Sequence, residues 1–169
     1  IVSIVEEEGV EHKNPIVIEG LPDVGLVGTI AASYIVEKMK YNEIGYIESD
    51  LFPPVMVIHG GKLKSPFCLY GNEEVIVVSS EIAIPPNAVY PLTRTLADWF
   101  NNINAALVIS ITGLPVKNRM DIEKPEVFAV GNNEEVVKEL KAKQVELLQE
   151  GFIAGTYAVM LRECYKREL

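Results

Sequence analysis

A glycine-rich segment, GLPDVGLVGT at residues 20–29, is the feature that most constrains the fold of this chain. It lies between an apolar strand-like run at residues 16–18 and a helix-like run at residues 30–39. A strand, a glycine-rich turn and a helix in this order either direct backbone N–H groups at a ligand or let a helix pack close to a sheet. The choice between these two uses bears on whether the chain is an enzyme or a binding module.

The sequence of this segment argues against phosphate binding. Its glycines are five and then three residues apart, so neither G-x-G-x-x-G nor G-x-x-x-x-G-K-[ST] is present. Lysine and arginine are absent between Lys13 and Lys38, and Asp23 adds a negative charge that would repel phosphate. We expect Asp23 to cap the following helix, and Gly25 and Gly28 to allow close contact between helix and strand. An architectural role is therefore predicted, with a ligand-facing loop as the alternative.

Length and composition favour a single domain in a reducing compartment. The 169 residues are 49% hydrophobic, which is enough for one sizeable core. The net charge of −9 argues against nucleic acid as a partner, and the apolar runs are too short to span a membrane. The two cysteines, Cys68 and Cys164, have no neighbouring histidine, so we expect packed thiols and a cytoplasmic location.

Apolar periodicity divides the chain into strands and helices. Strands are expected at residues 1–6, 15–20, 43–49, 55–59, 67–70, 75–79, 105–111 and 127–130. Helices are expected at residues 24–40, 87–103, 133–148 and 157–167. The strand at 75–79 has the uninterrupted apolar run of a central strand covered on both faces, and the strand at 105–111 is also expected to be buried.

This order of elements predicts an α/β fold with a mixed sheet between helices on both faces, a three-layer arrangement. The first helix is expected to pack on the sheet through Ile30, Tyr34, Ile35 and Met39 together with neighbouring alanines. Loops that follow parallel strands meet at one edge of a sheet. The loops at 20–28, 80–87 and 112–118 are therefore expected to form a crevice.

Residues that could carry chemistry are few and scattered. Glu81 follows a buried strand and could place a carboxylate in the crevice, but no G-x-S-x-G elbow surrounds the serines before it. Arg94 and Arg119 are the best candidates for contact with an anion, although a surface salt bridge is the ordinary role for Arg94. A solvated or capping role is favoured for each candidate carboxylate, since none belongs to a close metal-ligand motif: Glu19, Asp23, Glu81 and Asp121. The two histidines form no such pattern either, so no metal and no cofactor are expected.

A proline-stiffened apolar segment suggests a contact with another molecule. It consists of Leu51, Phe52, Pro53, Pro54, Val55 and Met56. Such a segment serves as an oligomer contact as readily as it serves as core, and the sequence leaves both uses open.

Several segments, in this order, give the chain a resemblance to a known family. They are Gly20-Leu21-Pro22-Asp23-Val24-Gly25-Leu26-Val27-Gly28, Phe52-Pro53-Pro54, residues 66–70, Ser80-Glu81-Ile82-Ala83-Ile84-Pro85, Tyr90-Pro91-Leu92 through Trp99, Thr112-Gly113-Leu114-Pro115 and Gly151-Phe152-Ile153-Ala154-Gly155. Over nearly its whole length the chain resembles the archaeal branch of the proteasome assembly chaperone family. That resemblance implies a fold similar to purine nucleoside phosphorylases, with no established catalytic site.

The family also implies partners. Its eukaryotic members chaperone assembly of the proteasome α-ring, some archaeal members form homo-oligomers, and some dock on the 20S proteasome through a C-terminal tail ending in hydrophobic-Tyr-X. This chain departs from that pattern, because it ends Arg167-Glu168-Leu169 and has Asp23 where the family often has glycine. Either residues 1–169 form a single domain that lacks a C-terminal helical part or tail, or this member does not dock in that way.

The sequence supports two alternative functions. The first is a non-enzymatic proteasome assembly chaperone or proteasome-binding adaptor that acts as a homo-oligomer. Its partners would be itself, 20S subunits or a related chaperone, and neither nucleic acid nor membrane. Residues 51–56 and the adjoining Gly60-Gly61 turn would form its contact surface. The alternative is an enzyme that handles a nucleoside or a phosphate in the crevice, with residues 20–28, Glu81, Arg94 and Arg119 lining the site.

Overall fold

A computed structural model describes residues 1–169, with the exception of the side chain of Arg119. The strands are β1 (Val2–Glu6), β2 (Ile16–Gly20), β3 (Asn42–Ser49), β4 (Val57–His59), β5 (Lys62–Lys64), β6 (Phe67–Gly71), β7 (Val75–Ser80), β8 (Leu107–Ser110), β9 (Phe128–Ala129) and β10 (Glu146–Leu147). The helices are α1 (Val27–Met39), α2 (Val89–Asn102), α3 (Glu134–Ala142) and α4 (Gly155–Arg167), with short 3-10 turns η1 (Val24–Leu26) and η2 (Arg119–Asp121). None of the described helices is long and apolar enough to cross a membrane.

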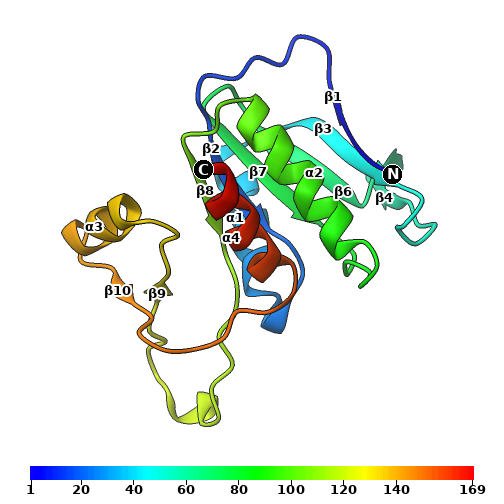
Figure 1. Cartoon of the computed structure of the whole chain (residues 1–169). Coiled ribbons are helices and arrows are strands. Elements are labelled where there is room, and N and C mark those ends of the chain that lie inside the picture. Colours follow the sequence, from blue (N-terminus) through cyan, green and yellow to red (C-terminus); the bar gives the residue numbers. More distant parts are fainter.

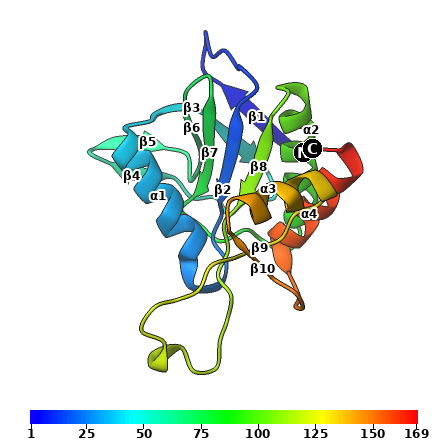
Figure 2. The same ribbon diagram turned by 90° about the vertical axis from the view of Figure 1, so that its left-hand side faces the viewer.

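The centre of the molecule is a six-stranded mixed sheet in the order β1-β3-β6-β7-β2-β8. The strands β7, β2 and β8 are parallel, whereas β1, β3 and β6 run in alternating directions on the other side of β7. Helix α1 covers one face of the sheet, and α2 and α4 lie together on the other (Figures 1 and 2). The predicted three-layer α/β fold with a mixed sheet is therefore confirmed.

The core lies between the sheet and the α2–α4 layer. Strand β7 is central as predicted, and the side chains of Ile76, Val77 and Val78 are fully buried. Helix α2 presents Leu92, Leu96 and Phe100, spaced four residues apart, to this core, and all three are fully buried. Pro91 fits in the first turn of α2 because the N–H groups there have no partner within the helix.

Strand β8 differs from the prediction. A buried strand was expected at 105–111, but β8 covers only Leu107–Ser110 and forms the edge of the sheet, where Ile109 and Ser110 are exposed. Its apolar sequence predicts a strand correctly, because β-branched residues fit a pleated, half-buried surface. The position of a strand within a sheet depends on pairing between distant segments, which local sequence does not specify.

The predicted helix at 133–148 is wrong in its second half. Helix α3 ends at Ala142, Gln144 takes a left-handed conformation with φ 59°, and the chain continues as β10. Strand β10 pairs in parallel with β9, so these residues form a small β9–α3–β10 unit. Val145 and Leu148 happened to continue the helical spacing of the α3 valines, which is why periodicity extended the helix too far.

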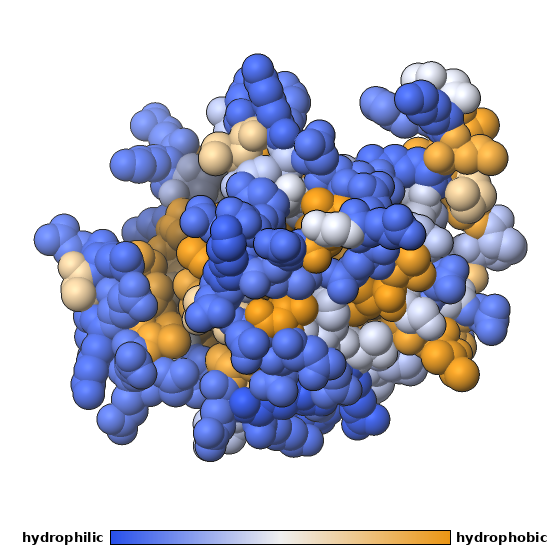
Figure 3. All heavy atoms as spheres, turned by 90° about the horizontal axis from the view of Figure 1, so that it is seen from above, coloured by the Kyte–Doolittle hydropathy of each residue, from blue (hydrophilic) through white to orange (hydrophobic). Residues whose placement is uncertain are grey.

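The β9–α3–β10 unit stands apart from the sheet (Figure 1). Between this unit, β8 and α4 there is a groove of about 1420 Å³. Seen from above, it is a shadowed hollow with apolar side chains on its walls (Figure 3). We call this space the β8 groove.

Candidate functional site

The glycine motif allows α1 to lie against the end of β2. A Cβ atom at Gly20 would lie 2.1 Å from the Cβ of Ala32 and 2.5 Å from the carbonyl oxygen of Gly28. Those distances leave no space for any side chain, so the helix can approach only because both positions are small. Within α1, Gly28 and Ala32 are the buried residues.

The same motif brings α1 against the residues that follow β8. A Cβ at Gly28 would lie 2.1 Å from the carbonyl oxygen of Ile111, and a Cβ at Gly113 would lie 2.3 Å from that of Val24. The loops at 20–28 and 112–118 therefore meet, as the sequence predicted for the parallel strand ends. Their contact is made by packed backbone, which supports the architectural interpretation of the glycines.

Close approach also turns the large side chains of α1 outward. Ile30, Tyr34 and Met39 were expected to pack on the sheet, but each is at least 60% exposed. Only small side chains fit between α1 and the end of β2, so these three side chains lie on the opposite side of the helix, whereas Ile35 is half-buried. The outer face of α1 consequently exposes these three large side chains, with the Lys38 ammonium 5.5 Å from the centre of the Tyr34 ring.

Asp23 does not have the capping role that was predicted. Its side chain makes no capping hydrogen bond, and the residue before α1 is Leu26 in a left-handed conformation. The hydroxyl of Thr112 instead donates to the Asp23 carboxylate and joins the loops after β2 and β8. Gly25, with φ 68°, provides the turn that separates Asp23 from the start of α1.

Glu19, a carboxylate for which the sequence favours a solvated or capping role, is instead buried in the structure. It lies near the end of β2, is fully buried, and accepts a hydrogen bond of 2.6 Å from the hydroxyl of Ser110 on β8. Its second oxygen, Oε1, has no partner among the described residues. Burial raises the pKa of Glu19 to about 7, with the Ser110 hydrogen bond acting in the opposite direction.

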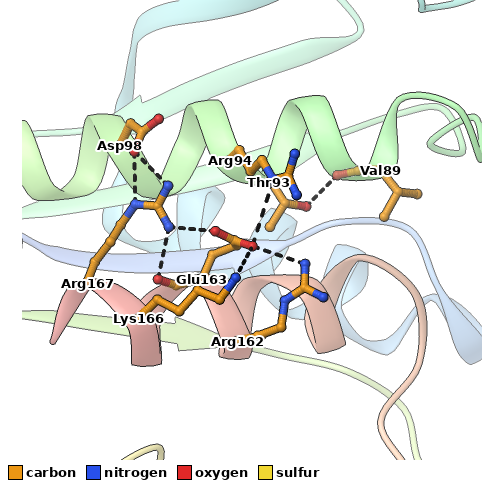
Figure 4. Close-up of polar contacts among 8 residues, drawn as sticks. All are labelled: Val89, Thr93, Arg94, Asp98, Arg162, Glu163, Lys166 and Arg167. Atoms are coloured by element: carbon orange, nitrogen blue, oxygen red, sulfur yellow. Dashed lines mark hydrogen bonds and ion pairs between the residues drawn. The ribbon is translucent and has the colours of Figure 1, made fainter.

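The three residues of the hypothetical enzyme crevice have different surroundings. Glu81 is exposed, and its backbone N–H donates to the carbonyl oxygen of Pro66 at 2.9 Å. Arg94 lies on α2 and faces α4, with its Nε 3.8 Å from the carboxylate of Glu163 (Figure 4). The side chain of Arg119 lies outside the described part of the structure. No described contact joins Glu81 to Arg94.

Arg94 belongs to an ion cluster between α2 and α4, which Figure 4 shows. At its centre, Glu163 has a side chain that is only 5% exposed, with Arg162 at 3.0 Å and Lys166 at 3.8 Å. Arg167 donates to Glu163 Oε2 at 2.7 Å and to Asp98 on α2 at 2.7 and 2.9 Å. The Arg167 hydrogen bond is the main reason that the pKa of Glu163 is lowered to about 2. In the sequence, the sign of this cluster is the group of basic residues Arg162, Lys166 and Arg167 around Glu163 in α4.

Both cysteines are packed thiols in the structure. Burial raises the pKa of Cys68 to about 11 and that of Cys164 to about 12. A nucleophilic cysteine requires a thiolate, which these values disfavour at neutral pH.

The proline-stiffened segment is anchored at one residue and exposed beyond it. Phe52 stacks on the buried Phe67 with a ring separation of 4.0 Å, and the next four residues, 53–56, are exposed. The chain then forms the β4–β5 hairpin, whose two-residue turn has φ values of 56° and 77° at Gly60 and Gly61.

This hairpin adds two apolar side chains to the exposed segment. Ile58 and Leu63 are directly opposite one another in the β4–β5 pair, and they are 72% and 74% exposed. Directly paired residues of a hairpin place their side chains on the same face. We define the hairpin surface as Pro53, Pro54, Val55, Met56, Ile58 and Leu63.

Comparison with known proteins gives the family of this chain. The model of the PAC2 family matches residues 17–169, which is nearly the whole chain. The chain belongs to the PAC2 family. This confirms the resemblance to the proteasome assembly chaperone family that the sequence motifs indicated.

Relatives of this PAC2 family chain come from archaea. The uncharacterized protein MJ0106 of Methanocaldococcus jannaschii is 33% identical over 161 residues, which are 95% of this chain and 65% of the relative. This chain therefore spans slightly less than two thirds of the length of that protein.

Two solved structures have the same fold. Pyrococcus furiosus PbaA, described as an archaeal homolog of proteasome-assembly chaperone, is 32% identical with a TM-score of 0.92; the match covers 99% of this chain and 72% of PbaA. Pyrococcus furiosus PbaB, described as an archaeal proteasome activator, is 22% identical with a TM-score of 0.83, covering 98% of this chain and 75% of PbaB. The similarity to PbaB concerns the fold alone.

Proposed function

We propose that this chain is a non-enzymatic protein-binding adaptor of the proteasome assembly chaperone type, which acts as a homo-oligomer in the cytoplasm. Its proposed partners are a second copy of itself and either proteasome 20S subunits or a related chaperone. The observation that carries the proposal is the hairpin surface, where six exposed apolar residues come from one short stretch of the chain, residues 53–63, in a protein with a net charge of −9.

The hairpin surface has the properties of a protein contact. Exposed apolar side chains cost little singly, but a contiguous group of them commonly marks an interface. Phe52 fixes the base of the segment by its stacking on Phe67, and two prolines limit the conformations of the chain beyond it. A segment that is already ordered loses less conformational entropy when it binds.

Family membership and the likeness to PbaA support a role in proteasome assembly. The outer face of α1 also favours protein binding, because its large apolar side chains are exposed to water in the isolated chain and a partner would bury them.

The alternative of an enzyme that handles a nucleoside or a phosphate is not favoured. It required Glu81 and an arginine to converge on a concave pocket, whereas Arg94 is engaged with Glu163 and Glu81 is exposed. Within the described residues, no group of three or more metal-ligating side chains is assembled.

Native mass spectrometry of the chain, alone and with 20S proteasome α-subunits, tests the proposal. We expect a defined homo-oligomer that captures α-subunits. The double variant Ile58→Thr/Leu63→Thr places a β-branched side chain suited to a strand at both positions, and it should weaken self-association by about tenfold or more.

Tyr165→Ser is the matched control, because Tyr165 is 67% exposed on α4, away from the hairpin surface. A monomer that captures no α-subunit would contradict the proposed function. An oligomer unaffected by the double variant would contradict only the assignment of the surface.

A further inference from the structure

Strand β8 has one side without a strand partner. Among the described residues it pairs with β2 alone. The N–H of Ile111 donates to the carbonyl oxygen of Glu19 on β2 at 3.0 Å. Because successive N–H groups of an extended strand point to opposite sides, the N–H groups of Val108 and Ser110 point away from β2. Neither has a hydrogen-bond partner among the described residues.

The free side of β8 opens into the β8 groove. Val108 and Ser110 both line that groove, as do the apolar side chains of Leu107, Leu114 and Met160. An unpaired strand edge is a template for a further strand, and natural proteins usually cover such an edge or disrupt it with charges or proline. Strand β8 itself contains no charged residue and no proline.

The rim of the groove is acidic. The charged residues that line it are Asp23, Glu126, Glu135, Glu139, Glu168 and one cation, Lys124. Of these carboxylates, Glu139 pairs with Lys143 at 3.4 Å and Asp23 accepts from Thr112. Among the described residues no ion pair engages Glu126, Glu135 or Glu168, so these carboxylates can face an incoming cation. The groove therefore combines a free strand edge, apolar walls and a negative rim.

We propose that the β8 groove binds an extended segment of another polypeptide, which adds as a strand to the free edge of β8. The segment would have apolar side chains at alternate positions and lysine or arginine at its ends. Its backbone would pair with Val108 and Ser110, and its basic ends would face Glu126, Glu135 and Glu168. This mode of binding draws affinity from main-chain hydrogen bonds and specificity from alternate side chains. It is independent of the hairpin surface.

A pair of synthetic peptides tests the charge and the backbone requirement. The probes are acetyl-Lys-Val-Thr-Val-Thr-Lys-amide and the same peptide with glutamate in place of both lysines. Isothermal titration should show binding of the lysine peptide and affinity at least about tenfold lower for the glutamate peptide. Amide hydrogen exchange should slow at Val108 and Ser110 when the lysine peptide binds.

Variants of the protein separate backbone pairing from packing. Val108→Pro removes the N–H that points away from β2, and an edge strand tolerates proline at such a position. Val108→Ala is the control, because it keeps that N–H and shortens the same side chain. We expect Val108→Pro to bind the lysine peptide at least about tenfold more weakly than Val108→Ala. Glu135→Lys should also weaken binding, whereas Glu48→Lys, which changes the net charge equally on the distant β3, should not.

Three results would overturn the proposal. The first is that the lysine peptide does not bind at about 1 mM, and the second is that the lysine and glutamate peptides bind with equal affinity. The third is that the lysine peptide slows amide exchange at α1 or the hairpin surface but does not slow it at β8. If Val108→Pro does not fold, a lysine peptide methylated at every backbone nitrogen replaces it as the test, and undiminished binding of that peptide would contradict strand addition. None of these results depends on whether the chain self-associates or captures proteasome subunits.

Discussion

The hydroxyl of Tyr157 on α4 holds both backbone groups of Leu21. It accepts from the Leu21 N–H at 2.7 Å and donates to the Leu21 carbonyl oxygen at 2.8 Å, across 136 residues of sequence. Leu21 is fully buried directly after β2, where its backbone has left the sheet. A buried N–H or C=O without a partner is costly, so this tyrosine completes the hydrogen bonding of the glycine motif.

Tyr157→Phe should therefore destabilise the protein without creating a large cavity. Loss of the hydroxyl leaves two buried backbone groups unpaired, and we expect a decrease of about 2–3 kcal/mol in the free energy of unfolding. Urea denaturation followed by circular dichroism measures it. A decrease below about 0.5 kcal/mol would mean that water replaces the hydroxyl at both groups.

Gly28 and Gly25 provide a matched pair within one motif. Gly28→Ala would place a Cβ 2.1 Å from the Ile111 carbonyl oxygen, so α1 must move, and we expect a loss of about 3 kcal/mol or a failure to fold. Gly25→Ala meets nothing closer than 3.7 Å and should cost only about 1 kcal/mol, from its φ of 68°. Thermal melts of both variants compare the two effects. Equal losses would argue against close packing as the role of Gly28.

Glu19 should make stability depend on pH. Burial raises the pKa of Glu19 from 4.5 to about 7. Between pH 4.5 and pH 7, therefore, Glu19 keeps its proton in the folded state and has lost it in the unfolded state. Its contribution is fully present below pH 4.5 and is lost as the pH rises through 7, by about 3 kcal/mol in total. Glu19→Gln has no proton to lose. Its stability relative to the parent should rise from pH 4.5 to pH 8, and a difference that stays constant over this range would contradict the assignment.

Arg167 should not be replaceable by lysine. Its guanidinium reaches Glu163 and Asp98 together, and so joins α4 to α2, whereas a single ammonium cannot reproduce that geometry. We expect Arg167→Lys to cost about 2 kcal/mol, and the control Arg162→Lys, at a 45% exposed side chain, less than about 1 kcal/mol. Chemical denaturation at pH 7 measures both.

The stability of the Glu163 cluster at acid pH provides a second test of the role of Arg167. The pKa of Glu163 is lowered from 4.5 to about 2, so its contribution is present above pH 4.5 and lost as the pH falls toward 2. The stability difference between Arg167→Lys and the parent should shrink over that range. A difference independent of acid would show that the cost comes from packing of the side chain.

Much of the fold could be predicted from local sequence. The apolar run of β7 indicated a central strand, and the four-residue spacing of Leu92, Leu96 and Phe100 indicated the buried face of α2. Both are signals within one element, since periodicity states which side of a strand or helix avoids water. The same method failed for α3, because spacing alone does not show where a helix stops.

The candidate sites were predictable only in part. The proline-stiffened segment was singled out from sequence, but the exposed pair Ile58 and Leu63 became apparent only when β4 and β5 paired. Glu19 and Glu163 have no sequence motif, and their shifted pKa values arise from burial and from neighbours on other elements. Such environments are assembled by residues far apart in the chain.

The sequence by itself determined most of the strands and helices, the family, and the small residues that let α1 approach β2. Tertiary structure decided the rest: the place of β8 at the edge of the sheet, the outward turn of Ile30, Tyr34 and Met39, and the junction of Leu21 with Tyr157. The physical reason is that hydrophobic periodicity is a local property of the chain. Strand order, burial of a carboxyl and satisfaction of a backbone group depend on which distant segments come into contact.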